Sequence, residues 1–165
     1  MPEPPLEDGE LVYRQVPNVA THFRRDGERT TFFSSAFNDV GMQPSVDRAT
    51  KRGLDPSASK KAPSDGVVAL VVGDIRALAS VVQNDAQGRP IQVHRVDVIP
   101  APIVATETRP ANDAHCLVVC DPALRVGNVF KRLRTALALL ADRAGWAVEP
   151  SDPGPETAGQ QPEPS

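Results

Sequence analysis

One long amphipathic helix near the C-terminal end constrains the fold of this 165-residue chain more than any other segment. From about residue 124 to residue 144, apolar residues recur in steps of three and four, which places them in one stripe along a helix. Gly145 follows, where glycine commonly ends a helix. Such a helix needs an apolar surface to cover. The stripe consists of Val126, Val129, Phe130, Leu133, Leu137, Leu140 and Ala144.

The segments before this helix are mainly typical of short strands. They are rich in β-branched and aromatic residues, and one of them, VVALVVG, is the continuous apolar run of a buried central strand. A short helix is predicted over 74–82, because Asp74 can cap it. We therefore expect an α+β or mixed α/β fold, with a small sheet and one long C-terminal amphipathic helix. The predicted strands are residues 10–16, 30–37, 67–73, 91–99 and 115–120.

The two ends of the chain differ in composition from the part between them. Residues 1–10 contain three prolines and four acids, and residues 150–165 are rich in Pro, Gly, Gln and Glu. Neither end can bury enough apolar surface to offset the entropy lost on ordering, so both are predicted to be disordered. The globular part is then a single domain, residues 11–149, within the usual size range.

The charge of the chain is unevenly distributed. The ends carry −4 and −3, which leaves +4 on residues 11–149 when the formal net charge is −3. Acidic ends can keep the protein soluble or can shield a basic surface, but +4 is too small to indicate a nucleic-acid-binding domain. No apolar run approaches the roughly 20 residues of a membrane span, and the N-terminus does not resemble a signal peptide. We expect a cytoplasmic protein without membrane contact.

The cysteines and glycines indicate neither a metal nor a cofactor site. Cys116 and Cys120 lie four residues apart in one predicted strand, about 13 Å from each other, which is too far for a disulfide. With His115 they do not form a zinc spacing either. No glycine-rich phosphate-binding loop is present. The cysteines are therefore predicted to be reduced core residues.

Residues 11–49 concentrate aromatic side chains together with Arg14 and the serine pair Ser34 and Ser35. Arg14 and the serines can simply complete a sheet, or they can line a polar pocket in which the guanidinium binds an anion. His115 and Asp47 can join them, since a hydroxyl, an imidazole and a carboxylate are the groups of nucleophilic catalysis. A lone strand histidine is more often structural, and no G-x-S-x-G motif is present. The candidate pocket is Arg14, Ser34, Ser35, Asp47 and His115.

The order of a strand with Tyr13-Arg14, a glycine-containing loop and a strand with Ser34-Ser35 resembles the opening of ADP-ribosyltransferase-type enzymes. In those enzymes an arginine or histidine on the first strand and a Ser-x-Ser-like strand help to hold NAD. The resemblance covers about 25 residues and implies that Arg14 and one serine would bind NAD. The family's late glutamate is matched only by Glu107, which lies between prolines and on no evident strand.

A second resemblance covers residues 12–146. The segments YRQV, SSAF, PSVD, GVVALVVGD, AHCLVV and LADRAGW are similar to those of a family of small bacterial proteins. Members of that family carry YRQV, S-x-AF, LSVD, HA and GW segments in the same order. The family has no established activity, so the resemblance implies a single domain and assigns no functional residue.

Three functions from different classes remain open. The leading interpretation is a small accessory or interaction domain without catalytic activity, which binds a protein partner or a small ligand. The first alternative is an ADP-ribosyltransferase-like enzyme or toxin that uses NAD through Arg14, Ser34 or Ser35, and Glu107. The second is a nucleic-acid-associated protein that uses the basic face of the last helix. That face consists of Arg125, Lys131, Arg132, Arg134 and Arg143.

Overall fold

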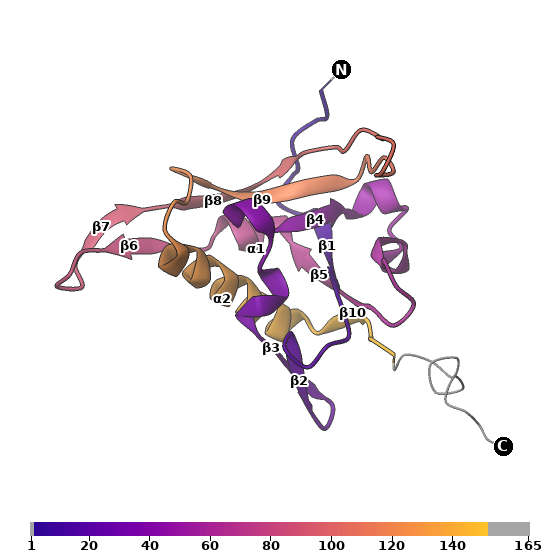
Figure 1. The fold of residues 1–165 in the computed structure, drawn as a ribbon, viewed down its shortest axis with the longest axis horizontal. Coiled ribbons are helices and arrows are strands. Elements are labelled where there is room, and N and C mark those ends of the chain that lie inside the picture. Colours follow the sequence, from indigo (N-terminus) through magenta and orange to yellow (C-terminus); the bar gives the residue numbers. More distant parts are fainter. Residues whose placement is uncertain (1, 152–165) are drawn as a thin grey trace.

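The structure, a computed structural model, describes residues 2–151 and is dominated by a six-stranded antiparallel sheet (Figure 1). The strand order is β10–β5–β1–β4–β9–β8, and two hairpins, β2–β3 and β6–β7, lie outside this sheet. The strands of the sheet are β1 (Leu11–Val16), β4 (Ser45–Arg48), β5 (Gly66–Val71), β8 (Arg95–Pro100), β9 (His115–Asp121) and β10 (Trp146–Val148). The hairpin strands are β2 (Phe23–Asp26), β3 (Arg29–Phe32), β6 (Val82–Asn84) and β7 (Pro90–Val93).

Residues 2–151 contain one long α-helix, one short α-helix and four single-turn 3-10 helices. The long helix α2 runs across one side of the sheet, with the two hairpins near its two ends (Figure 1). The mixed α+β composition is thus confirmed, although the sheet contributes more of the fold than expected. The helices are α1 (Val72–Arg76), α2 (Gly127–Ala144), η1 (Ser34–Phe37), η2 (Val40–Met42), η3 (Ala49–Arg52) and η4 (Pro56–Ser59).

The single strand predicted over 91–99 is wrong, because the segment is divided at His94 into β7, which pairs with β6, and β8, which pairs with β9. Two further predicted elements differ in type or length from those observed. The second predicted strand ends at Phe32, and Ser34–Phe37 forms η1 instead. The helix predicted over 74–82 is the shorter α1, and residues 82–84 form β6. In both places tertiary contacts override the local sequence preference. Ser34–Phe37 has high β-propensity but packs against α2 as η1, and residues 82–84 follow a helical spacing but pair with β7.

The two faces of the sheet are covered to different extents. Because side chains alternate along a strand, Val12 and Val16 of β1 join the main core, while Tyr13 points to the other face. The main core lies between the sheet and α2, where Leu133 and Leu137 are fully buried. The other face has only a small apolar cluster around Tyr13, so polar side chains occupy the rest of it.

The aromatic residues of the N-terminal part mainly build the core. Trp146 packs edge-on against Phe23 and Phe32, with ring centroids 5.0 and 4.6 Å away, and its Nε1 donates a hydrogen bond to Thr30. A β-carbon at Gly66 would lie 2.8 Å from Trp146 Cε3, so this glycine permits the close approach of the indole. The concentration of aromatics in residues 11–49 therefore reflects packing.

The prediction of disorder for residues 1–10 is wrong for residues 2–10. Leu6 is buried in the main core, and Arg48 donates hydrogen bonds to the carbonyl oxygens of Pro4 and Pro5 and to both carboxylate oxygens of Glu10. The hydrogen bonds from Arg48 hold the pKa of Glu10 below its ordinary value. Of the predicted C-terminal tail, residues 152–165 lie outside the described part of the chain, and Pro150 is buried.

Both cysteines are free thiols. Cys116 is buried and Cys120 is half-buried, and burial raises the pKa of each thiol to about 11. Within residues 2–151, no helix is both long enough and apolar enough to cross a membrane.

Candidate functional site

A polar cavity of about 850 Å³ lies mainly on the face of the sheet opposite α2. Its floor comes from β1, β4 and β9, and its sides come from the η3–η4 segment and from residues 101–114. The cavity is lined by Tyr13, Arg14, Gln15, Asp39, Val40, Ser45, Val46, Asp47, Arg52, Ala58, Ser59, Lys60, Lys61, Ile103, Arg109, Pro110, Ala111, Asn112 and His115.

Ser45 and His115 form a hydrogen-bonded pair on the cavity floor. Strands β4 and β9 are neighbours in antiparallel register, with Asp47 opposite His115, so Ser45 lies on the diagonal from His115. The Ser45 Oγ is 3.0 Å from His115 Nε2, and His115 Nδ1 is 2.7 Å from the carbonyl oxygen of Ala101. A carbonyl oxygen only accepts, so Nδ1 carries a proton, and in the neutral imidazole Nε2 accepts the hydrogen bond from the serine hydroxyl.

The Arg14–Asp39 ion pair holds the main chain of Ser45. The guanidinium bonds both Asp39 oxygens, at 2.6 and 2.9 Å, and also donates to the carbonyl oxygens of Ala36 and Ser45. Asp39 in turn accepts from the Ser45 N–H at 2.7 Å. Both polar main-chain groups of Ser45 are therefore fixed by one ion pair.

The charge state of Asp39 follows from these contacts. Burial alone would raise its pKa, but the hydrogen bonds from Arg14, the positive charge of Arg14 and the Ser45 N–H together outweigh burial. The pKa of Asp39 is therefore held below its ordinary value, and the carboxylate stays charged at neutral pH.

Asp47 connects the two sides of the cavity. Its carboxylate accepts hydrogen bonds from Ser59 at 2.8 Å and from Asn112 at 3.1 Å, and it forms an ion pair with Arg52 at 2.9 Å. Arg52 also donates to the Asn112 side-chain oxygen at 3.1 Å. The η3–η4 segment and the 101–114 segment are thus both fastened to β4.

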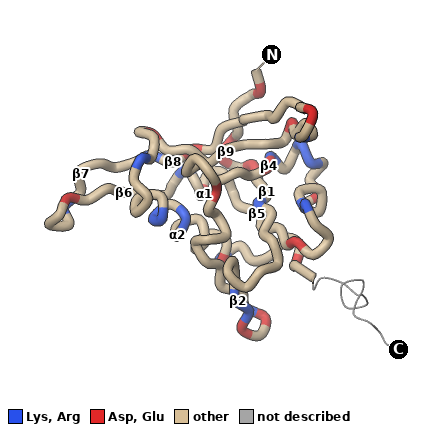
Figure 2. The backbone as a smooth tube through the Cα atoms, in the orientation of Figure 1, with Lys and Arg blue, Asp and Glu red and all other residues tan. Residues whose placement is uncertain are grey.

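The cavity has an excess of positive charge. Five Lys and Arg side chains line it against two Asp side chains, Asp39 and Asp47, which are already paired with Arg14 and Arg52. Within residues 2–151, Lys60, Lys61 and Arg109 have no carboxylate within 4.0 Å of their side-chain nitrogens. Figure 2 shows basic positions on the η3–η4 segment beside β4.

Three of the five candidate residues line this cavity, namely Arg14, Asp47 and His115. Ser34 and Ser35 do not, because they lie on η1, where the Ser35 hydroxyl donates to the carbonyl oxygen of Thr21. Glu107 does not line the cavity either.

Sequence reasoning missed Ser45, Asp39 and Asn112. The signal for Ser45 was its spacing, since it precedes Asp47 by two residues in PSVD and a strand places residues two apart on one face. Asp39 and Asn112 lie in irregular segments and gave no periodic signal.

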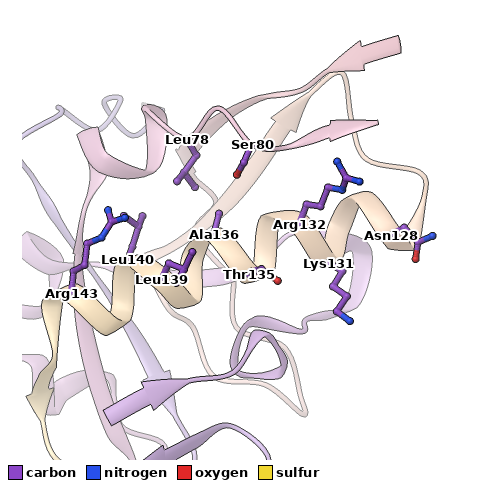
Figure 3. A pocket seen from close by; sticks show the side chains of 10 residues that line it. All are labelled: Leu78, Ser80, Asn128, Lys131, Arg132, Thr135, Ala136, Leu139, Leu140 and Arg143. Carbon is purple, nitrogen blue, oxygen red and sulfur yellow. The ribbon is translucent and has the colours of Figure 1, made fainter. Parts of the chain in front are cut away.

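A second cavity, which we call the α2 groove, lies between α2 and the segment that joins α1 to β6 (Figure 3). Its volume is about 610 Å³, and Leu139 in it is 51% exposed. Two of the five cations predicted to form a basic face are engaged within the domain. Arg132 donates to the Val82 carbonyl oxygen, and Arg134 lies 4.8 Å from the Phe130 ring centroid. The groove is lined by Leu78, Ser80, Asn128, Lys131, Arg132, Thr135, Ala136, Leu139, Leu140 and Arg143.

Neither the polar cavity nor the α2 groove is arranged as a metal site. Within residues 2–151, no group of three or more His, Cys, Asp and Glu side chains is placed to hold a metal ion. Comparisons of the chain with protein-family models, with curated proteins and with solved structures find no match.

Proposed function

We propose that this protein is a binding domain for a small anionic ligand, which carries a phosphate or carboxylate group and occupies the polar cavity. The observation that carries the proposal is the positive charge of Lys60, Lys61 and Arg109, which pair with no carboxylate of residues 2–151, around a hollow whose two acids are already neutralised. Positive side chains that converge on a concave site attract and retain anions, and the arginine fork suits oxygen pairs.

The rigidity of the cavity floor also supports ligand binding. Asp47, Arg52 and Asn112 are joined by mutual hydrogen bonds, and Ser45 is held by Asp39 and His115. Little conformational entropy would therefore be lost when a ligand contacts these side chains. The segments YRQV, PSVD and AHCLVV, on which the resemblance to the small bacterial family rests, each contribute a side chain to this floor. We place this binding in the cytoplasm, because both cysteines are free thiols.

Anions should raise the melting temperature of the protein. At a hundredfold excess over Kd, a ligand that binds only the folded state stabilises it by about 2.7 kcal/mol, which corresponds to several degrees in Tm. The test is a thermal-shift titration with inorganic phosphate, pyrophosphate and citrate at constant ionic strength. We expect the shift to disappear in the triple variant Lys60→Ala, Lys61→Ala, Arg109→Ala.

The matched control removes the same charge elsewhere. The triple variant Arg125→Ala, Lys131→Ala, Arg143→Ala alters only exposed positions on or near α2 and should keep the full shift. If no anion shifts wild-type Tm, or if both triple variants lose the shift equally, the cavity is not the anion site.

We propose a second binding function for the α2 groove, which would accept an acidic helical segment of a partner protein. The groove has an apolar floor that includes Leu78 and Leu139, and its charged lining residues are all basic, namely Lys131, Arg132 and Arg143. An amphipathic helix with acidic flanks is complementary to such a groove in both respects.

Binding of a designed acidic helix tests this second function. The probe is a fluorescein-labelled peptide of Glu and Leu, about four helical turns long, with a Lys/Leu peptide of the same pattern as its counterpart. We expect anisotropy to report binding of the acidic peptide alone, weakened about tenfold by Leu139→Asp. Val104→Asp, at an exposed apolar residue that does not line the groove, should leave binding unchanged. Tighter binding after deletion of residues 152–165 would instead indicate that the acidic tail occupies the groove.

A further inference from the structure

We propose that Ser45 is a nucleophile activated by His115, and that the polar cavity hydrolyses a small ester that carries an anionic group. The inference rests on the proposed function, because the anionic group of the substrate would be held by the basic side of the cavity. The observation that carries it is a serine and a histidine in hydrogen-bond contact on the floor of an open cavity, with the histidine fixed from behind.

His115 is held in the tautomer that a general base requires. Ala101 contacts it twice, since its carbonyl oxygen accepts from Nδ1 at 2.7 Å and its N–H donates to the His115 carbonyl oxygen at 2.9 Å. The neutral ring therefore presents an unprotonated Nε2 to the Ser45 hydroxyl, 3.0 Å away. A backbone carbonyl here fills the place of the third group that orients the base in a catalytic triad.

Ser45 is equally constrained. Asp39 accepts its N–H at 2.7 Å and Arg14 donates to its carbonyl oxygen at 2.8 Å, which fixes the main chain, and the hydroxyl is directed at His115 by its own hydrogen bond. Arg14 and Asp39 act as positioning residues. Because the Ser45 N–H is already occupied, the proposal assigns stabilisation of the negative charge that develops on the substrate to the basic side chains that line the cavity.

The reaction proceeds in two balanced steps. In the first, the Ser45 proton passes to His115 Nε2 as Oγ bonds the ester carbonyl carbon, and the bond to the alcohol oxygen breaks as that oxygen takes the proton from Nε2. In the second, Nε2 takes a proton from water, the water oxygen bonds the acyl carbon, and the Ser45 Oγ–acyl bond breaks as Oγ regains its proton. Ester and water yield acid and alcohol.

A serine-directed fluorophosphonate probe tests the nucleophile directly. Attack by Ser45 forms an Oγ–phosphorus bond and releases fluoride, so intact-mass spectrometry should show one adduct and peptide mapping should place it on Ser45. Ser45→Ala should abolish labelling, His115→Gln should slow it about 100-fold, and Ser34→Ala with Ser35→Ala should label like wild type. If the variants fail to fold, the site mapped on the wild type decides the question.

Fluorophosphonate labelling and anion-dependent thermal shifts, measured on the same protein samples, distinguish the nucleophile from the anion site. Phosphate-dependent stabilisation without any adduct on Ser45 would overturn the nucleophile and leave anion binding intact. An adduct on another serine, or equal labelling of wild type and His115→Gln, would also overturn it. Labelling of Ser45 without any anion shift in wild-type Tm would support the nucleophile and refute the anion site.

Discussion

Replacing Arg14 with leucine removes about 3 kcal/mol of the free energy of unfolding. The Arg14 side chain is only 11% exposed. Its loss leaves the Asp39 carboxylate with only the Ser45 N–H as a donor and removes the guanidinium from two carbonyl oxygens. Breaking one partner of a buried pair costs about 3–5 kcal/mol, and the lower end applies because Asp39 keeps 26% of its side chain exposed. Urea unfolding, with the midpoint and the slope both fitted, measures the loss.

The exposed pair Arg24–Asp26 supplies the matched control. Its side chains are 64% and 63% exposed, so Arg24→Leu should change stability by less than about 1 kcal/mol. Equal costs for the two substitutions would contradict the assigned role of Arg14.

The pH dependence of the free energy of unfolding at acidic pH should differ between wild type and Arg14→Leu. The pKa of Asp39 is lowered in the folded state, so the contribution of its carboxylate is present above the unfolded pKa and disappears as pH falls through the folded pKa. In Arg14→Leu the main cause of this lowering is absent, and the loss of stability on acidification should become shallower. A slope identical to that of wild type below pH 4 would show that the ion pair does not contribute.

Phe37→Ala should cost about 3–5 kcal/mol, because it leaves a cavity in a close-packed core. Phe37 is fully buried on η1, which packs against α2, and its ring centroid lies 5.3 Å from the Arg14 guanidinium carbon. The substitution therefore removes apolar contacts and loosens the support of Arg14. Chemical denaturation compares it with Phe33→Ala, at a half-buried neighbour, which should cost clearly less. A smaller loss for Phe37→Ala than for Phe33→Ala would contradict the observed packing.

Periodic segments were predictable, because their conformation depends on neighbours close in sequence. The stripe from Val126 to Ala144 matches α2 except at its start, which the structure places at Gly127. The order of residues 2–10 was not predictable, since it depends on Arg48, nearly 40 residues later, and on the burial of one residue, Leu6. No local pattern reports such a long-range contact.

The candidate site was predictable only in part for the same reason. Arg14, Asp47 and His115 are the chemically conspicuous groups, and all three line the cavity. The register between β4 and β9 places Ser45 beside His115, whereas Ser34 lies on η1, outside the sheet. An alternating sequence pattern predicts which face of a strand a residue occupies, but it does not predict which strand pairs with that strand.

The most direct test of anion binding in the polar cavity is an NMR titration of ¹⁵N-labelled protein with pyrophosphate at constant ionic strength. If pyrophosphate binds in this cavity, the amide signals of Ser45, Lys60, Lys61 and Asn112 shift saturably with one common Kd, and the signals of α2 stay unchanged. Shifts confined to α2, or shifts that grow linearly without saturation across the whole domain, would contradict it.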